Sequence, residues 1–217
     1  MTQIRGIFPE SRPFFLDGAD YFTSSNRLVH TRNIADPDFG VKVTGKDNGH
    51  SAGVIIAQDT ITSFLIPGSQ GSDIAVLDPA NADVFVARYQ KDVGDKNNIG
   101  FLATHRSSGE YSNDVLSFDG KYYFSKSDSL DIQYMRSESD NPLEVQDEFG
   151  LAPSQQDSAY TLSYRHRKED YHLRASYSDF GKDFRADMGF ISQVNYNKLV
   201  VGGGYNWFGE KESQWTR

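Results

Sequence analysis

Two neighbouring segments, SAYTLSYRHR (158–167) and YHLRASYS (171–178), decide the fold class of this chain. In both, aromatic, aliphatic or other weakly polar side chains stand at every second position, and polar residues fill most positions between them. This alternation is typical of β-strands that have one apolar face and one polar face. The charged and titratable residues of the polar face are Arg165, Arg167, His172 and Arg174.

Segments of the same kind recur along the chain at intervals of about ten residues, separated by turn-rich stretches. In 184–190, for example, Phe184, Ala186, Met188 and Phe190 alternate with Arg185 and Asp187. Helical periodicity is hard to find, so the sequence predicts an all-β protein of about eleven strands. We expect these strands at 27–33, 41–47, 50–58, 83–90, 98–104, 114–124, 129–136, 158–167, 171–178, 184–190 and 199–208.

The connections between these strands alternate in length. The expected short ones are 48–49, 91–97, 125–128, 168–169 and 192–198, and the long ones are 59–82, 105–113 and 137–157, with 179–183 as an exception. Outer-membrane barrels have short periplasmic turns and longer extracellular loops. The pattern therefore predicts an antiparallel up-and-down transmembrane β-barrel.

The direction of the strands follows from this assignment. If the long loops are outside, the strand at 41–47 runs toward the periplasm, and 27–33 and 199–208 both run upward. An odd number of strands results, whereas single-chain bacterial barrels have an even number. We therefore expect an incomplete barrel over 27–217 that lacks at least one C-terminal strand, preceded by a linker or plug-like segment at 1–26. That segment would lie on the periplasmic side or enter the lumen from it.

The turn of the 158–178 hairpin is predicted from charge. A two-residue turn at Lys168-Glu169 places Arg165 opposite His172. A four-residue turn would place Arg165 opposite Arg174, and like charges directly across a strand pair are destabilising. We expect the two-residue turn.

Composition is compatible with this fold and excludes several classes of function. The mean hydropathy is −0.59 and the hydrophobic content is 37%, but 12 Tyr, 15 Phe and 19 Gly suit strands with aromatic girdles. The formal net charge of −8 argues against nucleic acid as a partner. Cysteine is absent, which excludes disulfides and thiolate chemistry. Because no signal peptide follows Met1, we expect that Met1 is not the natural start.

The segments FPESRPFFLDGADYF (8–22) and TRNIADPDFGVKVTGK (31–46) resemble the start of an uncharacterised barrel family of Gram-negative bacteria. In that family, a domain similar to family-nine carbohydrate-binding modules precedes a C-terminal membrane barrel of unknown function. DMGFI (187–191) is similar to a later element of the same family. This sequence does not include the domain similar to carbohydrate-binding modules, and Asn33 stands where the family has the second Arg of a paired-Arg element. The matching motif residues are Phe8, Pro9, Glu10, Arg12, Pro13, Phe14, Phe15, Arg32, Lys42, Thr44, Gly45 and Lys46.

Charged residues on the polar faces of the predicted strands are candidates for the barrel lumen. They either pair with one another and fill a narrow interior, or line a conduit and select solutes. The candidates are Lys42, Asp131, Arg165, Arg167, His172, Arg174, Arg185 and Asp187.

No catalytic motif, metal-ligand spacing or cofactor motif is found, so we expect no enzyme activity, metal or cofactor. The leading hypothesis is a barrel in the outer membrane of a Gram-negative cell that conducts or binds a small solute such as a glycan. Its partners would be outer-membrane lipid and that solute. An outer-membrane enzyme with a site in the lumen or loops, and a soluble β-sandwich binding module, are the alternatives.

Overall fold

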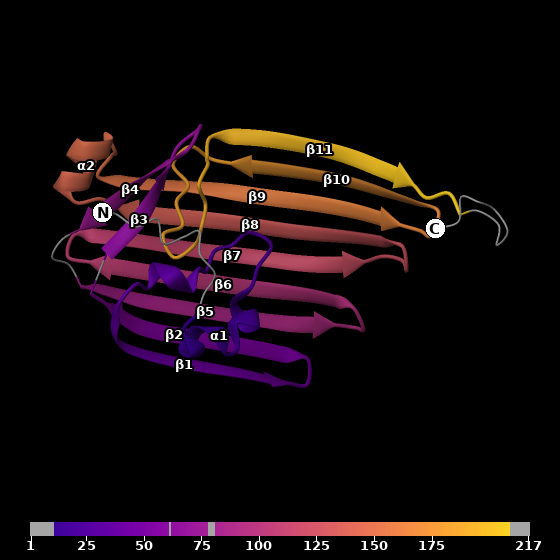
Figure 1. Cartoon of the computed structure of the whole chain (residues 1–217), viewed down its shortest axis with the longest axis horizontal. Helices are drawn as coiled ribbons and strands as arrows, with labels where there is room; N and C mark the ends of the chain where they lie inside the picture. Colours follow the sequence, from indigo (N-terminus) through magenta and orange to yellow (C-terminus); the bar gives the residue numbers. More distant parts are fainter. Residues whose placement is uncertain (1–10, 61, 78–80, 209–217) are drawn as a thin grey trace.

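The protein is a nine-stranded antiparallel sheet with an additional hairpin, as seen in a computed structural model that describes residues 11–60, 62–77 and 81–208 (Figure 1). Strands of the sheet follow one another in the order β1-β2-β5-β6-β7-β8-β9-β10-β11, each antiparallel to its neighbour. Their bounds are β1 Pro37–Asp47, β2 His50–Asp59, β5 Ala82–Val93, β6 Asn97–Ser108, β7 Tyr111–Tyr123, β8 Asp128–Asp140, β9 Ser154–Arg167, β10 Tyr171–Phe180 and β11 Tyr196–Tyr205. The predicted all-β, up-and-down barrel type of fold is confirmed. Within the described residues the sheet is open, because β1 and β11 each pair on one side only.

The two faces of the sheet differ in what covers them. Residues 11–36 and the connection 181–195 pack on one face, which we call the inner face, and the opposite face is the outer face (Figure 1). Residues 11–36 contain a helical turn α1 (Pro13–Leu16) and two 3-10 turns, η2 (Ala19–Phe22) and η3 (Thr31–Asn33). The hairpin of β3 (Thr62–Pro67) and β4 (Ser72–Leu77) and the short helix α2 (Leu143–Phe149) lie at one end of the sheet. No helix among these described residues is long and apolar enough to cross a membrane.

Residues 27–33 do not form the predicted strand. Leu28 is completely buried in an apolar cluster on the inner face, and the backbone N–H of His30 donates to the carbonyl of Met188 (2.6 Å). The 3-10 turn Thr31–Asn33 follows. The apolar side chains of this segment are therefore buried by packing across the sheet and not by strand pairing.

Residues 184–190 are not a strand either. They belong to the connection 181–195, and apolar and charged side chains of the segment are both buried: Phe184 is 1% exposed and Asp187 is 1% exposed. Phe184 and Ala186 pack in one apolar cluster on the inner face, and Met188 packs in another. A segment that lies between two packed layers shows the same alternation as a strand, which explains the wrong prediction.

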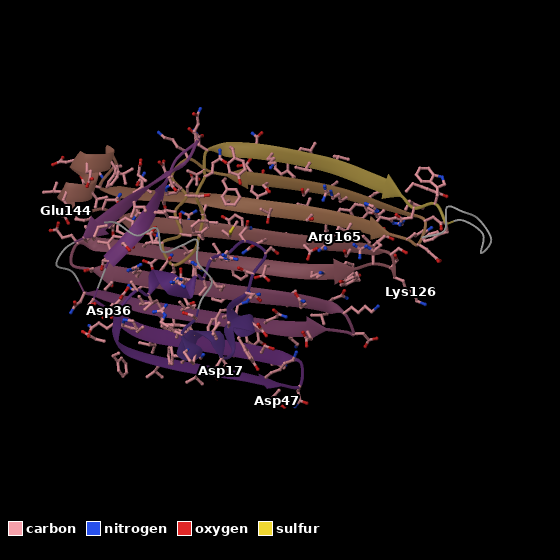
Figure 2. All side chains as sticks on the ribbon, in the orientation of Figure 1. Asp17, Asp36, Asp47, Lys126, Glu144 and Arg165 are labelled. Atoms are coloured by element: carbon pink, nitrogen blue, oxygen red, sulfur yellow. The ribbon has the colours of Figure 1, made fainter. Side chains whose placement is uncertain are left out.

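The connections differ in length between the two ends of the sheet. One end carries only short turns, at 48–49, 94–96, 124–127 and 168–170, and the other carries the long connections 60–81, 141–153 and 181–195 together with the two-residue turn 109–110. The expected exception at 179–183 disappears because 181–195 is a single long connection. The predicted long loop at 105–113 is wrong, because only Gly109 and Glu110 separate β6 from β7. The last strand, β11, runs toward the short-turn end, and its predicted upward direction is also wrong. Figure 2 labels Asp47 and Lys126 at the short-turn end and Asp36 and Glu144 at the opposite end.

The register of the β9–β10 hairpin corrects the predicted turn. Arg165 pairs directly with Arg174, and Lys168 and Tyr171 close a two-residue turn at Glu169-Asp170. The two guanidinium groups are separated by their other neighbours. Arg165 donates to Asp131 on β8 (2.8 Å), and Arg174 extends over Gly202 on β11. The predicted turn is wrong because the strands on either side, β8 and β11, draw the two guanidinium groups apart.

The N-terminal segment packs closely on the sheet at Gly53 of β2. A Cβ atom added at Gly53 would lie 2.7 Å from Cζ of Phe22, which is 5% exposed. We expect Gly53→Ala to force Phe22 out of its site and to lower the free energy of unfolding by about 1–3 kcal/mol, as overpacking does. Gly45→Ala on the neighbouring strand is the control, because a Cβ there meets nothing within 4 Å. Urea unfolding of the two variants tests this, and equal midpoints would contradict it.

Candidate functional site

Apart from Lys42, the charged residues of the inner face that were singled out from the sequence form two separate groups. One group is buried at the long-connection end, beneath the β3–β4 hairpin, and the other is exposed at the short-turn end, where Figure 2 labels Arg165. Inward positions at the two ends, such as Ser137 and Ser129 of β8, are eight residues apart, or about 27 Å along the strand. Each group therefore has its own environment.

The buried group is centred on Arg185. Its Nη1 donates to Oδ1 of Asn141 (2.7 Å), and its Nε lies 3.1 Å from Oδ1 of Asp187. The guanidinium also lies 5.0 Å from the ring centre of Phe64, which stacks on Tyr111. Arg185 therefore links the connection 181–195 to Asn141, to the β3–β4 hairpin through Phe64, and to β7 through Tyr111.

Asp187 is held by the same group. It accepts a hydrogen bond from the hydroxyl of Tyr111 (2.6 Å), and its backbone N–H donates to Asn113 of β7 (2.9 Å). Burial raises the pKa of Asp187, although Arg185 and the hydrogen bond from Tyr111 act in the opposite direction. Asp187 and Arg185 therefore form a buried ion pair, and the bonds of Asp187 to Tyr111 and Asn113 join the connection 181–195 to β7.

Two further ion pairs on the inner face were not singled out from the sequence. Asp59, at the end of β2, lies 3.4 Å from Arg106 of β6, and both side chains are fully buried. Arg88 of β5 forms a two-point ion pair with Asp119 of β7, in which Nη2 donates to Oδ2 (2.8 Å). The alternation of β5, β6 and β7 places these residues on the polar face, but nothing in it indicates which of them pair.

Two of the family-like motif residues hold the N-terminal segment in place: Arg12 by contacts within the segment, and Lys42 by contacts between the segment and β1. Arg12 donates to the backbone carbonyls of Ile34 (2.6 Å) and Thr31 (2.9 Å), and its guanidinium lies over the ring of the buried Phe15. Lys42, on the inner face of β1, donates to the carbonyls of Phe14 and Asp17. Phe8, Pro9 and Glu10 lie outside the described residues. The ammonium group of Lys42 is therefore bonded to the backbone of the N-terminal segment and is not an unpaired charge on the inner face.

The exposed group contains the charged residues predicted from the β9–β10 hairpin. Arg165, Arg167, His172 and Arg174 all lie on the inner face, and all four are exposed. Asp131 accepts from Arg165 and also lies 3.6 Å from Lys121. Arg185 and Asp187, which were predicted to share a ladder with these residues, lie at the other end of the sheet.

A cavity of about 380 Å³ lies beside the exposed group. Its walls are Arg165 and Asp131, hydroxyl-bearing residues of β9 and β10, and Ser25 and Asn26 of the N-terminal segment. Asn26 is fixed there, because its side-chain amide donates to Gln133 (2.9 Å) and to Thr161 (3.1 Å). The cavity offers polar groups to a hydrophilic molecule, and no group of three metal-ligating side chains occurs in the part of the chain that the structure describes.

Comparisons with known proteins give a similarity of fold only. No family model matches the sequence, and no curated protein is significantly similar to it. Outer-membrane expressed OmpT of Vibrio cholerae is similar in structure, with a TM-score of 0.46 and 14% identity over 82% of this chain and 59% of that one. In-vitro folded OmpT, an outer membrane protein of Vibrio cholerae, gives a TM-score of 0.47 and 14% identity over 82% and 58%. The chain thus spans less than two thirds of the length of these structures.

Proposed function

We propose that this chain forms part of the wall of an outer-membrane β-barrel whose inner face contacts a hydrophilic solute, as a conduit or a ligand-binding surface. The observation that carries the proposal is the outer face, where a band of exposed apolar side chains crosses all nine strands. Such a band is what the lipid-facing side of a barrel presents. Its members include Val43, Ile56, Phe85, Ile99, Leu116, Phe118, Ile132, Tyr134, Leu162, Leu173, Leu199 and Val201.

The direction of this band relative to the strands supports a barrel wall. Val54 is the middle of the outward apolar stretch of β2. Its cross-strand partners on the strands that follow, taken one after another, are Ala87, Ala103, Leu116, Arg136 and Ser158. On β10 this series of partners arrives at Gly181, whose N–H donates to Ser158 (3.0 Å). The outward apolar stretch of β10, Tyr171 to Tyr177, is instead centred at position 174, seven residues before 181.

The band therefore drifts along the strands while it crosses the sheet. Six strand-to-strand steps separate β2 from β10. With a rise of ~3.4 Å per residue and ~4.8 Å between strands, a drift of seven residues over six steps corresponds to a strand tilt of ~40°. Strands of transmembrane barrels tilt by about 35–45° from the membrane normal. A flat bilayer in contact with tilted strands accounts for this drift.

The soluble sandwich alternative requires that a second sheet buries these same side chains. In the described part of the chain they remain open: Ile132 is 47% exposed and Leu199 is 68% exposed. The strands of the sheet have 10 to 14 residues, which is enough to cross a bilayer at this tilt. The inner face supplies the polar surface that a water-filled or solute-binding interior needs, and its hydroxyl-lined cavity is suited to a sugar-like solute.

Recovery from the outer membrane tests the proposal. We expect the full-length gene product, expressed in a Gram-negative host, to fractionate with the outer membrane and to require detergent for extraction. Unheated, it should migrate on SDS gels differently from the boiled protein, because a folded barrel resists SDS. Recovery as a detergent-free soluble monomer would overturn the proposal.

A further inference from the structure

We propose that the exposed inner surface of β9 and β10, with the cavity beside it, is a binding site for a small hydrophilic solute that carries a carboxylate or phosphate group. This proposal rests on the barrel proposed above and specifies the chemical class of its solute. Three features of this surface support the proposal: the sign of its local charge, the arrangement of two arginines and the hydroxyl groups beside them.

The local charge is opposite to that of the whole chain. The chain carries a formal net charge of −8, yet this surface gathers Lys121, Arg165, Arg167 and Arg174, of which Lys121 and Arg165 contact the carboxylate of Asp131. No described acidic side chain other than Asp131 is in ion-pair contact with Arg165, and none is in such contact with Arg167 or Arg174. A concentration of one sign of charge on a concave surface attracts solutes of the opposite sign.

The two central arginines are neighbours in the sheet, but their side chains extend in opposite directions. Arg165 and Arg174 are direct partners across β9 and β10, and the side chain of Arg165 extends toward Asp131. Arg174 turns the other way, over β11, because its partner there is Gly202: a Cβ at Gly202 would lie 3.2 Å from Nε of Arg174. Glycine at this position therefore provides the space in which the guanidinium rests against the sheet.

Hydroxyl groups lie beside the two arginines, further along the same two strands. The next inward pair on the same two strands is Ser163 and Ser176, followed by Thr161 and Ser178, and all four line the cavity. Guanidinium groups bind carboxylate and phosphate through two parallel hydrogen bonds, and hydroxyl groups bind the oxygen atoms of a polyhydroxyl body. A cavity of about 380 Å³ is of the size that small ligands occupy.

Calorimetric titration of the detergent-solubilised full-length protein tests the site. The probes are gluconate, which has a carboxylate on a polyhydroxyl chain, inorganic phosphate, and the neutral polyol sorbitol. We expect gluconate and phosphate to bind and sorbitol to bind at least 10-fold more weakly, since charge-assisted hydrogen bonds to arginine are lost. Binding of the anions should weaken as salt is raised, because the site is open to solvent.

Variants then locate the binding. Arg174→Gln should weaken gluconate binding about 10-fold, and Arg174→Lys should weaken it less, since the charge remains but the fork is lost. Arg136→Gln is the matched control, because Arg136 lies on the outer face of the same sheet, bonded to Gln156. An unchanged affinity in Arg174→Gln, equal affinities for sorbitol and gluconate, or no anion binding would overturn this site.

The failure of the site and the failure of the barrel are distinguishable. Arg174 is exposed, so its variants should keep the heat-modifiable migration of the native protein. A heat-modifiable outer-membrane protein that binds no anion leaves the barrel intact and removes only the solute class. Loss of heat modifiability in the native protein overturns both proposals together.

Discussion

Replacing Arg185 with alanine is expected to lower the free energy of unfolding by about 3–5 kcal/mol, because the change leaves a buried carboxylate without its cation. Arg185 is 4% exposed and Asp187 is 1% exposed, so water cannot replace the lost partner. The variant also loses the hydrogen bond to Asn141 and the contact with the ring of Phe64. Urea unfolding in detergent gives the measurement.

The effect should depend on pH in a defined direction. Burial already raises the pKa of Asp187, and Arg185 opposes that rise. Without Arg185 the pKa of Asp187 rises further in the folded state, so the folded state binds a proton more tightly than the unfolded state does. Stability of the variant then falls as the pH rises from the ordinary aspartate pKa toward the raised one. The deficit should be smaller at pH 4 than at pH 8.

A control separates this effect from the general loss of a cation in the same connection. Lys182 lies three residues before Arg185 and is exposed. Lys182→Ala should change the free energy of unfolding by less than about 0.5 kcal/mol, as surface substitutions usually do. Equal losses in the two variants, or a deficit for Arg185→Ala that is the same at both pH values, would contradict a buried ion pair.

The second large effect is expected at the outer face. Leu162→Arg should lower the stability of the membrane-inserted protein by about 2–4 kcal/mol, because the residue lies within the band of exposed apolar side chains that we propose faces lipid, where a charge is costly. Leu162 is 41% exposed and is paired with Ile132 and Tyr177 on the neighbouring strands. Unfolding by urea from lipid vesicles measures the loss.

The adjacent residue provides a matched control. Ser163 follows Leu162 on the same strand but faces inward, opposite Asp131. Ser163→Arg introduces the same side chain on the polar face and should cost less than about 1 kcal/mol, because the new charge stays hydrated and near a carboxylate. Similar losses for both variants would mean that the outer face does not contact lipid.

Alternation of side chains predicted which residues share a face, and this is the most reliable part of the sequence analysis. Tyr160, Leu162 and Tyr164 lie outward, and Arg165 and Arg174 lie inward, as expected. The property is local, because successive side chains of a strand point to opposite faces whatever the strand pairs with. The same property misassigned 184–190, since alternation does not reveal whether the layers on each side are lipid and lumen or two parts of the protein.

Pairing across the sequence could not be predicted in this way. Arg106 and Asp59 form a buried ion pair although Asp59 falls within the predicted loop 59–82. Arg185 and Asp187 were expected with Arg174, and the inward fold of the connection 181–195 places them at the opposite end. These placements depend on contacts between distant segments, which no local pattern encodes. A role in the lumen for the candidate residues stays a prediction.

The hydrogen bonds that hold residues 11–36 on the inner face affect the order in which the protein folds. Asn26 bonds to Gln133 and Thr161, and Asn33 bonds to the carbonyls of Asp187 (2.8 Å) and Gly189 (2.7 Å). The partners of Asn33 are 154 and 156 residues away in the chain. Contacts of such separation form slowly, because the entropy of closing a long loop is lost before they contribute. Residues 11–36 precede the sheet in the chain, yet we expect them to be among the last segments to reach their native positions, after most of the sheet has assembled.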